Sequence, residues 1–306
     1  MELTLNREYK DRVFRDIFGK EERKEYTLSL YNAVNGTHYT DPSLIQLNTL
    51  QNFIYMKMKN DVSFIIDAQL ELYEHQSTFN PNMPYRCFQY LAALYDTYLE
   101  QREEKEWIYD SEIVLLPTPQ CVVFYNGERK TEDVFELSLK DSFTVPEKSC
   151  LDLTVKVINC NYGRNEALME HCQELRDYAQ FVDRSRKYLR NRQETQLTKE
   201  EAVLKAIDEM IKQNGPLAPY FKAQRSEVCH LFIMDYDEEK TLKSIGERHE
   251  KIGEEHGIQV GKELGKNLRD QEKIQEMLAA GKTPEAIIEF CNYPSNLVYD
   301  IANKMK

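Results

Sequence analysis

The sequence predicts an α/β fold, in which a mixed β-sheet is flanked by helices and followed by further helices. Two neighbouring segments, 62–66 and 70–72, place their apolar residues at every second position, which is typical of strands. Helical spacing of apolar residues comes before and after this pair, and the apolar runs 121–125 and 151–159 favour two more strands. From residue 165 onward the spacing is helical. The order helix, strands, helix, strand therefore indicates an α/β core with a helical extension.

Local signals define the individual elements. Helices are expected over 7–18 and 22–34, where apolar residues recur at helical spacing and a glycine follows. An extended segment over 44–58 leads into the paired strands, and a tyrosine-rich helix ends near Leu99. Later helices are expected over 165–182, over 198–214 behind a capping box of Thr198 and Glu201, and over 217–233.

Four regions are expected along the chain. Residues 1–160 form the core, and residues 161–237 form a helical extension packed on it. Residues 238–270 form a charged segment with regularly spaced glycines, either a solvated linker or a loose helical stalk. Residues 271–306 form a module of helix-turn-helix size. Its last helix carries few cations near its start, which favours contact with a protein or a second copy over specific DNA reading.

The composition excludes several classes of protein. A net charge of −12 argues against a globally basic nucleic-acid-binding protein, although a locally basic groove remains open. No run of about 18 apolar residues occurs, so we expect no contact with a membrane interior. The seven cysteines form no CxxC pair, and the N-terminal residues lack the features of a secretory signal. These observations favour a cytoplasmic protein with reduced thiols.

The paired strands bring two acids together. If the chain reverses at Asp67 and Ala68, residue 66 pairs with residue 69, and the register places Asp61 opposite Glu74. Opposed residues have Cβ atoms roughly 4.5–5.5 Å apart, and two carboxylates that close repel unless a proton or a metal lies between them. A register shifted by two residues would separate the acids.

The neighbours of the two acids are assigned to faces by the alternation of the strand. Gln76 projects from the same face as Glu74. His75 points the other way, but its backbone carbonyl could also face a cation. Asp67 is expected in the turn, and Glu71 is expected to face solvent.

Cationic side chains near and beyond the acids have two interpretations each. Arg86 lies one helical turn before Tyr90, and it either braces a carboxylate or holds a phosphate. The densest basic run either contacts DNA phosphates or forms a solvated helix end. It consists of Arg184, Arg186, Lys187, Arg190 and Arg192.

The order of these motifs resembles the PD-(D/E)xK nucleases, and more narrowly the bacterial recombination-promoting nuclease (Rpn) and transposase family. The stretches that carry the resemblance are 11–19, 59–61, 72–78, 80–90, 122–127, 161–163, 177–183 and 201–207. Each motif is weak alone, but together and in this order they cover most of residues 7–240. The charged, glycine-punctuated tail is also typical of this group.

The resemblance implies an endonuclease that hydrolyses DNA with Mg²⁺ or Mn²⁺, linked to recombination, mobile elements or phage defence. It implies that Asp61, Glu74 and the carbonyl of His75 bind the metal, and that Gln76 takes the place of the lysine of the motif. Acids of the first helix, Asp11 and Asp16, are candidates for a supporting role. The alternative is a catalytically weak DNA-binding or oligomerisation protein on the same fold, which forms a homo-oligomer through its C-terminal region.

Overall fold

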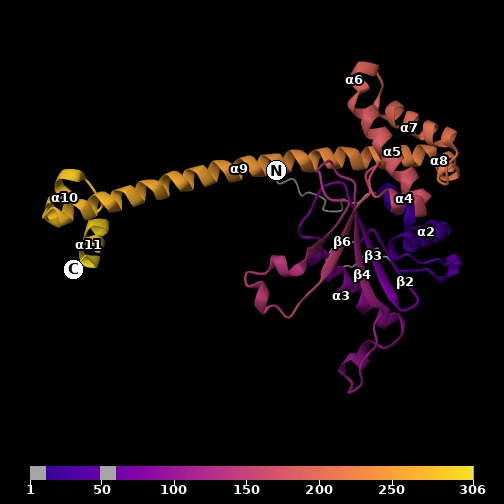
Figure 1. Ribbon diagram of the computed structural model, residues 1–306, viewed down its shortest axis with the longest axis horizontal. Coiled ribbons are helices and arrows are strands. Elements are labelled where there is room, and N and C mark those ends of the chain that lie inside the picture. The colour runs from indigo at the N-terminus through magenta and orange to yellow at the C-terminus, as the bar shows by residue number, and fades with distance from the viewer. Residues whose placement is uncertain (1–11, 49–59, 306) are drawn as a thin grey trace. The chain divides into compact units, whose positions relative to one another are not determined.

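The computed structural model describes residues 12–48 and 60–305, apart from the side chains of several positions between 238 and 267 (Figure 1). The chain divides into two compact units at residues 240 and 241. Each unit is described separately below.

One mixed sheet forms the centre of the first unit. Within the described residues it has the strand order β1-β2-β3-β4-β6-β5. The strands are β1 (Gln46–Leu47), β2 (Val62–Ile66), β3 (Gln69–Gln76), β4 (Thr118–Tyr125), β5 (Val134–Ser138) and β6 (Thr154–Asn159). Strands β3, β4 and β6 are parallel, and the other neighbouring pairs are antiparallel. The predicted mixed sheet of an α/β fold is therefore confirmed.

The register of the β2–β3 hairpin agrees with the prediction. Ile66 pairs with Gln69 and Val62 pairs with Tyr73, so the next position along each strand sets Asp61 opposite Glu74. The chain reverses through Asp67, whose φ of 52° lies in the left-handed region. Aspartate tolerates this conformation better than most residues do, which explains a tight turn without glycine.

Helices cover both faces of the sheet (Figure 1). On one face, α3 (Met83–Gln101) packs on a core that includes Leu70, Leu72 and Val123. On the other face, α1 (Arg12–Phe18), α2 (Lys24–Asn35) and α5 (Gln173–Arg190) pack on a larger core that includes Phe64 and Phe124. Because both faces of these strands are covered, β3 is almost wholly buried, and so is β4 from Cys121 onward.

Further helices extend the larger core. They are α4 (Glu166–His171), α7 (Lys199–Gln213) and α8 (Ala218–Ala223), whereas the short helix α6 (Arg192–Thr195) has no buried residue. Both hydrogen bonds of the predicted capping box between Thr198 and Glu201 start α7. Short 3₁₀ helices lie at Glu21–Arg23, Pro42–Leu44, Lys105–Tyr109, Leu139–Ser142 and Pro146–Lys148.

Two elements differ from the prediction. The single helix expected over 217–233 is split, because α8 ends at Ala223 and α9 (Arg225–Ala279) begins two residues later. For residues 238–270 the sequence allowed either a solvated linker or a loose helical stalk, and the structure has a helix there, within α9. Strand β5 was not predicted. It is a short edge strand with exposed positions, so it carries little apolar signal.

The second unit has its own small core. The end of α9 packs with α10 (Pro284–Cys291) and α11 (Ser295–Lys304) around Ile274, Ile287, Val298 and Ile301. Thr283 caps α10 by accepting a hydrogen bond from the Ala286 N–H. Throughout the described part of the chain, each helix is too short or too polar to span a membrane.

Candidate active site

The two acids predicted to face each other are joined by backbone hydrogen bonds at the end of the hairpin. The Asp61 N–H donates to Glu74 Oε1 at 2.9 Å, and the His75 N–H donates to Asp61 Oδ2 at 2.9 Å. The exposed fractions of Asp61 and Glu74 are only 1% and 2%. Their side chains therefore continue the pairing of the two strands just beyond the first residue of β2.

Arg86 braces this acid pair from α3. Its Nη2 lies 3.1 Å from Glu74 Oε2 and donates to the Tyr90 hydroxyl at 2.8 Å. Burial acts to lower the pKa of Arg86, but the carboxylate of Glu74 and the oxygen of Tyr90 outweigh it, and the net pKa is raised. Of the two roles predicted for Arg86, the structure shows the contact with a carboxylate.

His75 lies on the opposite face of the sheet, as the alternation predicts. Its Nε2 shares a hydrogen bond of 3.1 Å with the Tyr178 hydroxyl on α5, and its ring packs 5.0 Å from that of Phe14. Gln76 ends β3 and is 8% exposed. Because residues 74 and 76 of a strand share a face, Gln76 lies on the side of Glu74.

The oxygen atoms at this end of β3 fit a hard divalent cation. The His75 N–H points toward Asp61, and the carbonyl of a paired strand residue leaves on the same side as its N–H. Two carboxylates and one carbonyl are thus directed to the same place, and such oxygen ligands suit Mg²⁺ or Mn²⁺. Over residues 12–48 and 60–305, no three His, Cys, Asp or Glu side chains gather to hold a metal. Water would therefore complete the coordination of any cation here.

Two acids lie away from where the sequence suggested a role. The Asp16 carboxylate accepts from the Tyr220 hydroxyl at 2.9 Å and lies 3.1 Å from Arg23, so its contacts are with helices and not with the acid pair. Asp11 lies outside the described residues. Glu71 was expected to face solvent, and this was wrong, since its exposed fraction is 0%. It lies across from Phe64 on the face that α2 covers.

The basic run on α5 does not act as one surface. Arg184 turns toward α7, where it donates to Gln213 at 2.8 Å. Arg186 and Arg190 turn the other way, to Asn126 and Glu128 in the loop after β4. Lys187 is exposed, and Arg192 is half-buried in α6. The helical repeat separates these side chains, because residues 184 and 186 lie on different faces of a helix.

The cations of that loop were not found from the sequence. Arg129 and Lys130 lie in the loop that follows β4, and with Arg186 and Arg190 they line one cavity. A basic pair after a buried strand and an Asn-Gly turn was the available signal. This basic pair lines a cavity only because α5 lies beside the loop, and local sequence does not reveal that neighbour.

Comparisons of the chain with protein-family models, with curated proteins and with solved structures give no match.

Proposed function

We propose that this protein is a metal-dependent endonuclease that hydrolyses phosphodiester bonds of DNA. The observation that carries the proposal is the buried pair Asp61 and Glu74, held together at the end of β3 beside Gln76. The resemblance of the sequence to PD-(D/E)xK nucleases supports the same reaction. On this basis the protein acts in the cytoplasm, in recombination, mobile elements or phage defence.

The residues present would divide the chemistry among them. Asp61, Glu74 and the His75 carbonyl would hold Mg²⁺ or Mn²⁺, which supplies activation of water and stabilises charge on a phosphate oxygen. Gln76 can orient the attacking water through its amide but cannot accept its proton as a base. Arg86 offsets part of the negative charge of the acids before a cation binds.

The test compares wild type with Asp61→Ala on plasmid and single-stranded DNA, with Mg²⁺ or Mn²⁺. Removing a ligand of the metal is expected to lower cleavage by at least about 100-fold. Asp152→Ala, which removes an exposed carboxylate paired with Lys140, serves as the control and should leave cleavage unchanged. Equal cleavage by wild type and Asp61→Ala would indicate a contaminating nuclease and overturn the proposal.

Gln76 gives a second, graded test of the same site. Gln76→Ala removes the amide that positions water, and we expect cleavage to fall by about 10- to 100-fold. Gln76→Lys restores a cation at this position and should retain more activity than Gln76→Ala. Single-turnover cleavage rates at saturating metal measure both effects. Identical rates for the two variants and wild type would exclude Gln76 from the reaction.

One observation favours a second candidate function. Arg86 already pairs with Glu74, and no lysine stands at position 76, so the acid pair has a protein counter-charge in place of a metal. A catalytically weak protein that binds DNA, or that assembles through its C-terminal helices, is therefore the alternative. Robust DNA binding without cleavage under any divalent metal would support it.

A further inference from the structure

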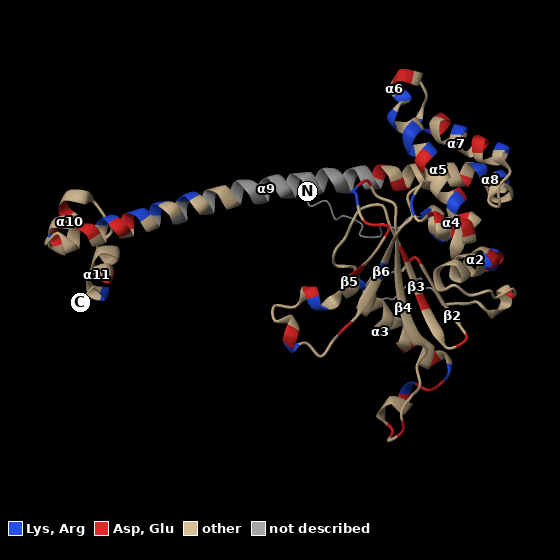
Figure 2. Ribbon diagram, viewed as in Figure 1, with Lys and Arg blue, Asp and Glu red and all other residues tan. Residues whose placement is uncertain are grey.

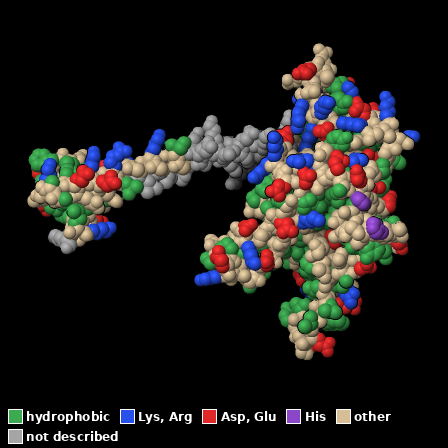
Figure 3. All heavy atoms as spheres, viewed as in Figure 1, with side chains coloured by type: hydrophobic (Ala, Val, Ile, Leu, Met, Phe, Trp, Pro, Cys, Tyr) green, Lys and Arg blue, Asp and Glu red, His purple; other side chains and the backbone are tan. Residues whose placement is uncertain are grey.

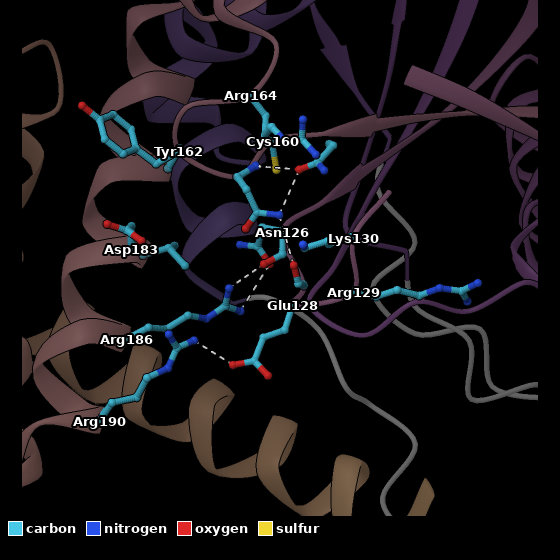
Figure 4. A pocket seen from close by; sticks show the side chains of 15 residues that line it. Asn126, Glu128, Arg129, Lys130, Cys160, Tyr162, Arg164, Asp183, Arg186 and Arg190 are labelled. Carbon is cyan, nitrogen blue, oxygen red and sulfur yellow. Dashed lines mark hydrogen bonds and ion pairs between the residues drawn. The ribbon is translucent and has the colours of Figure 1, made fainter. Parts of the chain in front are cut away.

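A cavity of about 380 Å³ lies at the carboxyl ends of β4 and β6, beside α5 (Figure 4). The loop after β4 forms one wall, the segment after β6 forms another, and α5 closes the side. In sheets with parallel strands, ligands bind in the crevice outside these carboxyl ends. The position alone makes the cavity a candidate binding site.

Asparagine side chains build the walls of this cavity. Asn161 Nδ2 donates to the Gly127 carbonyl at 3.1 Å and to Asn159 Oδ1 at 2.9 Å. Asn159 Nδ2 donates to the Thr131 hydroxyl at 3.0 Å, and Asn126 Nδ2 donates to the Tyr178 hydroxyl at 3.3 Å. These hydrogen bonds fix the loops, and the charged side chains of the lining supply the charge that a ligand would meet.

The charge of the cavity is opposite to that of the whole chain. Five cationic and two acidic side chains line it, whereas the chain carries a net charge of −12. Figure 2 shows acidic and basic residues interspersed along the described chain, and Figure 3 shows them mixed on the visible face. A local surplus of three positive charges on such a surface favours an anionic ligand.

Two of these cations are available to a ligand. Lys130 is exposed, and among residues 12–48 and 60–305 it has neither an ion pair nor a side-chain hydrogen bond. Arg190 pairs with Glu128 at 2.7 Å, but its side chain is 57% exposed and water weakens this pair. Arg186 reaches from α5 to Asn126 and holds the loop in place (Figure 4).

The cavity and the acid pair lie on opposite faces of the sheet, beside α5 and α3 respectively, and the end of β3 links them. The Asn126 N–H donates to the Gln76 carbonyl at 3.0 Å, so the loop starts beside the last residue of β3. Gly127 then passes so close to the chain that a Cβ there would lie 2.3 Å from the Ser77 carbonyl oxygen. Only glycine permits this approach, which places the loop that carries Lys130 beside the residue that follows β3.

We propose that this cavity binds a backbone phosphate of a DNA strand whose next segment crosses the end of β3 toward Asp61 and Glu74. The inference rests on the proposed function for its substrate class. It assigns Lys130 and Arg190 as phosphate contacts and Arg186 as the residue that positions the loop. Cationic side chains on exposed ends of loops and helices are the usual partners of DNA phosphates.

Binding can be measured apart from cleavage. Fluorescence anisotropy of labelled single-stranded and double-stranded DNA is recorded in Ca²⁺, which takes oxygen ligands more loosely than Mg²⁺ does. The double variant Lys130→Gln/Arg190→Gln is expected to bind DNA about tenfold more weakly. The plot of the log association constant against log salt concentration should become less steep by about one to two. Lys140→Gln/Arg225→Gln removes the same charge from two half-buried cations outside the cavity and should bind like wild type.

The outcomes separate this inference from the proposed function. Loss of affinity in the cavity variant, with no cleavage by wild type in any metal, supports the phosphate site and overturns the nuclease. Cleavage abolished by Asp61→Ala, with equal affinity and salt slope in the cavity variant and its control, overturns the phosphate site and leaves the nuclease. Absence of DNA binding by wild type at low salt also overturns the inference. Thermal unfolding of both double variants establishes that they are folded.

Discussion

Replacing Arg86 with methionine is expected to destabilise the protein by about 3 kcal/mol, because it leaves the buried Glu74 carboxylate without its cation. Glu74 is 2% exposed, whereas a third of the Arg86 side chain is exposed. Methionine retains much of the apolar stem, so the change chiefly removes charge and hydrogen bonds. Urea unfolding of wild type and variant, followed without divalent metal, measures the difference.

The same variant reports whether the acids take a cation. With Arg86 gone, Mg²⁺ or Ca²⁺ should bind the two carboxylates more tightly and raise the unfolding midpoint more than it does in wild type. Arg225→Met, which breaks a pair with Asp208 whose side chains are 43% and 51% exposed, should change neither stability nor metal response appreciably. If Arg86→Met loses stability and no divalent metal restores any of it, the acid pair is not a metal site.

Glu71→Gln is expected to stabilise the protein at pH 8 by about 3 kcal/mol. Burial raises the pKa of Glu71 from 4.5 to about 7, and the nearby Tyr73 hydroxyl offsets only part of this rise. Across the described residues, neither carboxylate oxygen of Glu71 has a hydrogen-bond partner. Ionising this side chain in the folded protein is therefore unfavourable, and glutamine has nearly the same shape without the charge.

The pH dependence follows from the direction of the shift. Below pH 4.5 Glu71 is protonated in both states and imposes no penalty, while between pH 4.5 and 7 only the unfolded state loses the proton. Stability thus falls as pH rises through this window and levels off above it. Unfolding curves at several pH values should show the fall in wild type and a weaker one in Glu71→Gln. Glu136→Gln, at an exposed position of β5, should show the same pH dependence as wild type. If the stability of Glu71→Gln fell with pH as steeply as that of wild type, Glu71 would not be the group responsible.

The hairpin could be predicted because its information is local. A period of two residues fixes which side chains share a face, and one choice of turn fixes the register, so Asp61 and Glu74 followed from counting. The direction of His75 followed from the same arithmetic. For Arg86 the sequence left two roles open, and the contact with the Glu74 carboxylate is shown only by the structure.

Features that depend on what covers a surface could not be predicted. Alternation placed Glu71 on one face of β3, but only the packing of α2 on that face makes it buried. The cationic cavity joins three segments far apart in the chain, with Lys130, Arg164 and Arg190 among its lining residues. No local pattern states that these segments meet. The break between α8 and α9 likewise lies in a continuous helical pattern around Gln224.

The mutual hydrogen bonding of the acid pair has a consequence for how its variants combine. Glu74 receives the backbone N–H of Asp61, and Asp61 receives the N–H of the residue after Glu74. A substitution at either residue thus removes the acceptor of a buried N–H on the other strand, while the backbone bond to the remaining carboxylate is kept. The two carboxylates lie close together, so removing one also changes the electrostatic environment of the other. The free-energy effects of the two single changes will not sum to that of the double change. The contributions of the two acids to the free energy of unfolding are therefore coupled, and a single substitution does not measure the contribution of one acid alone.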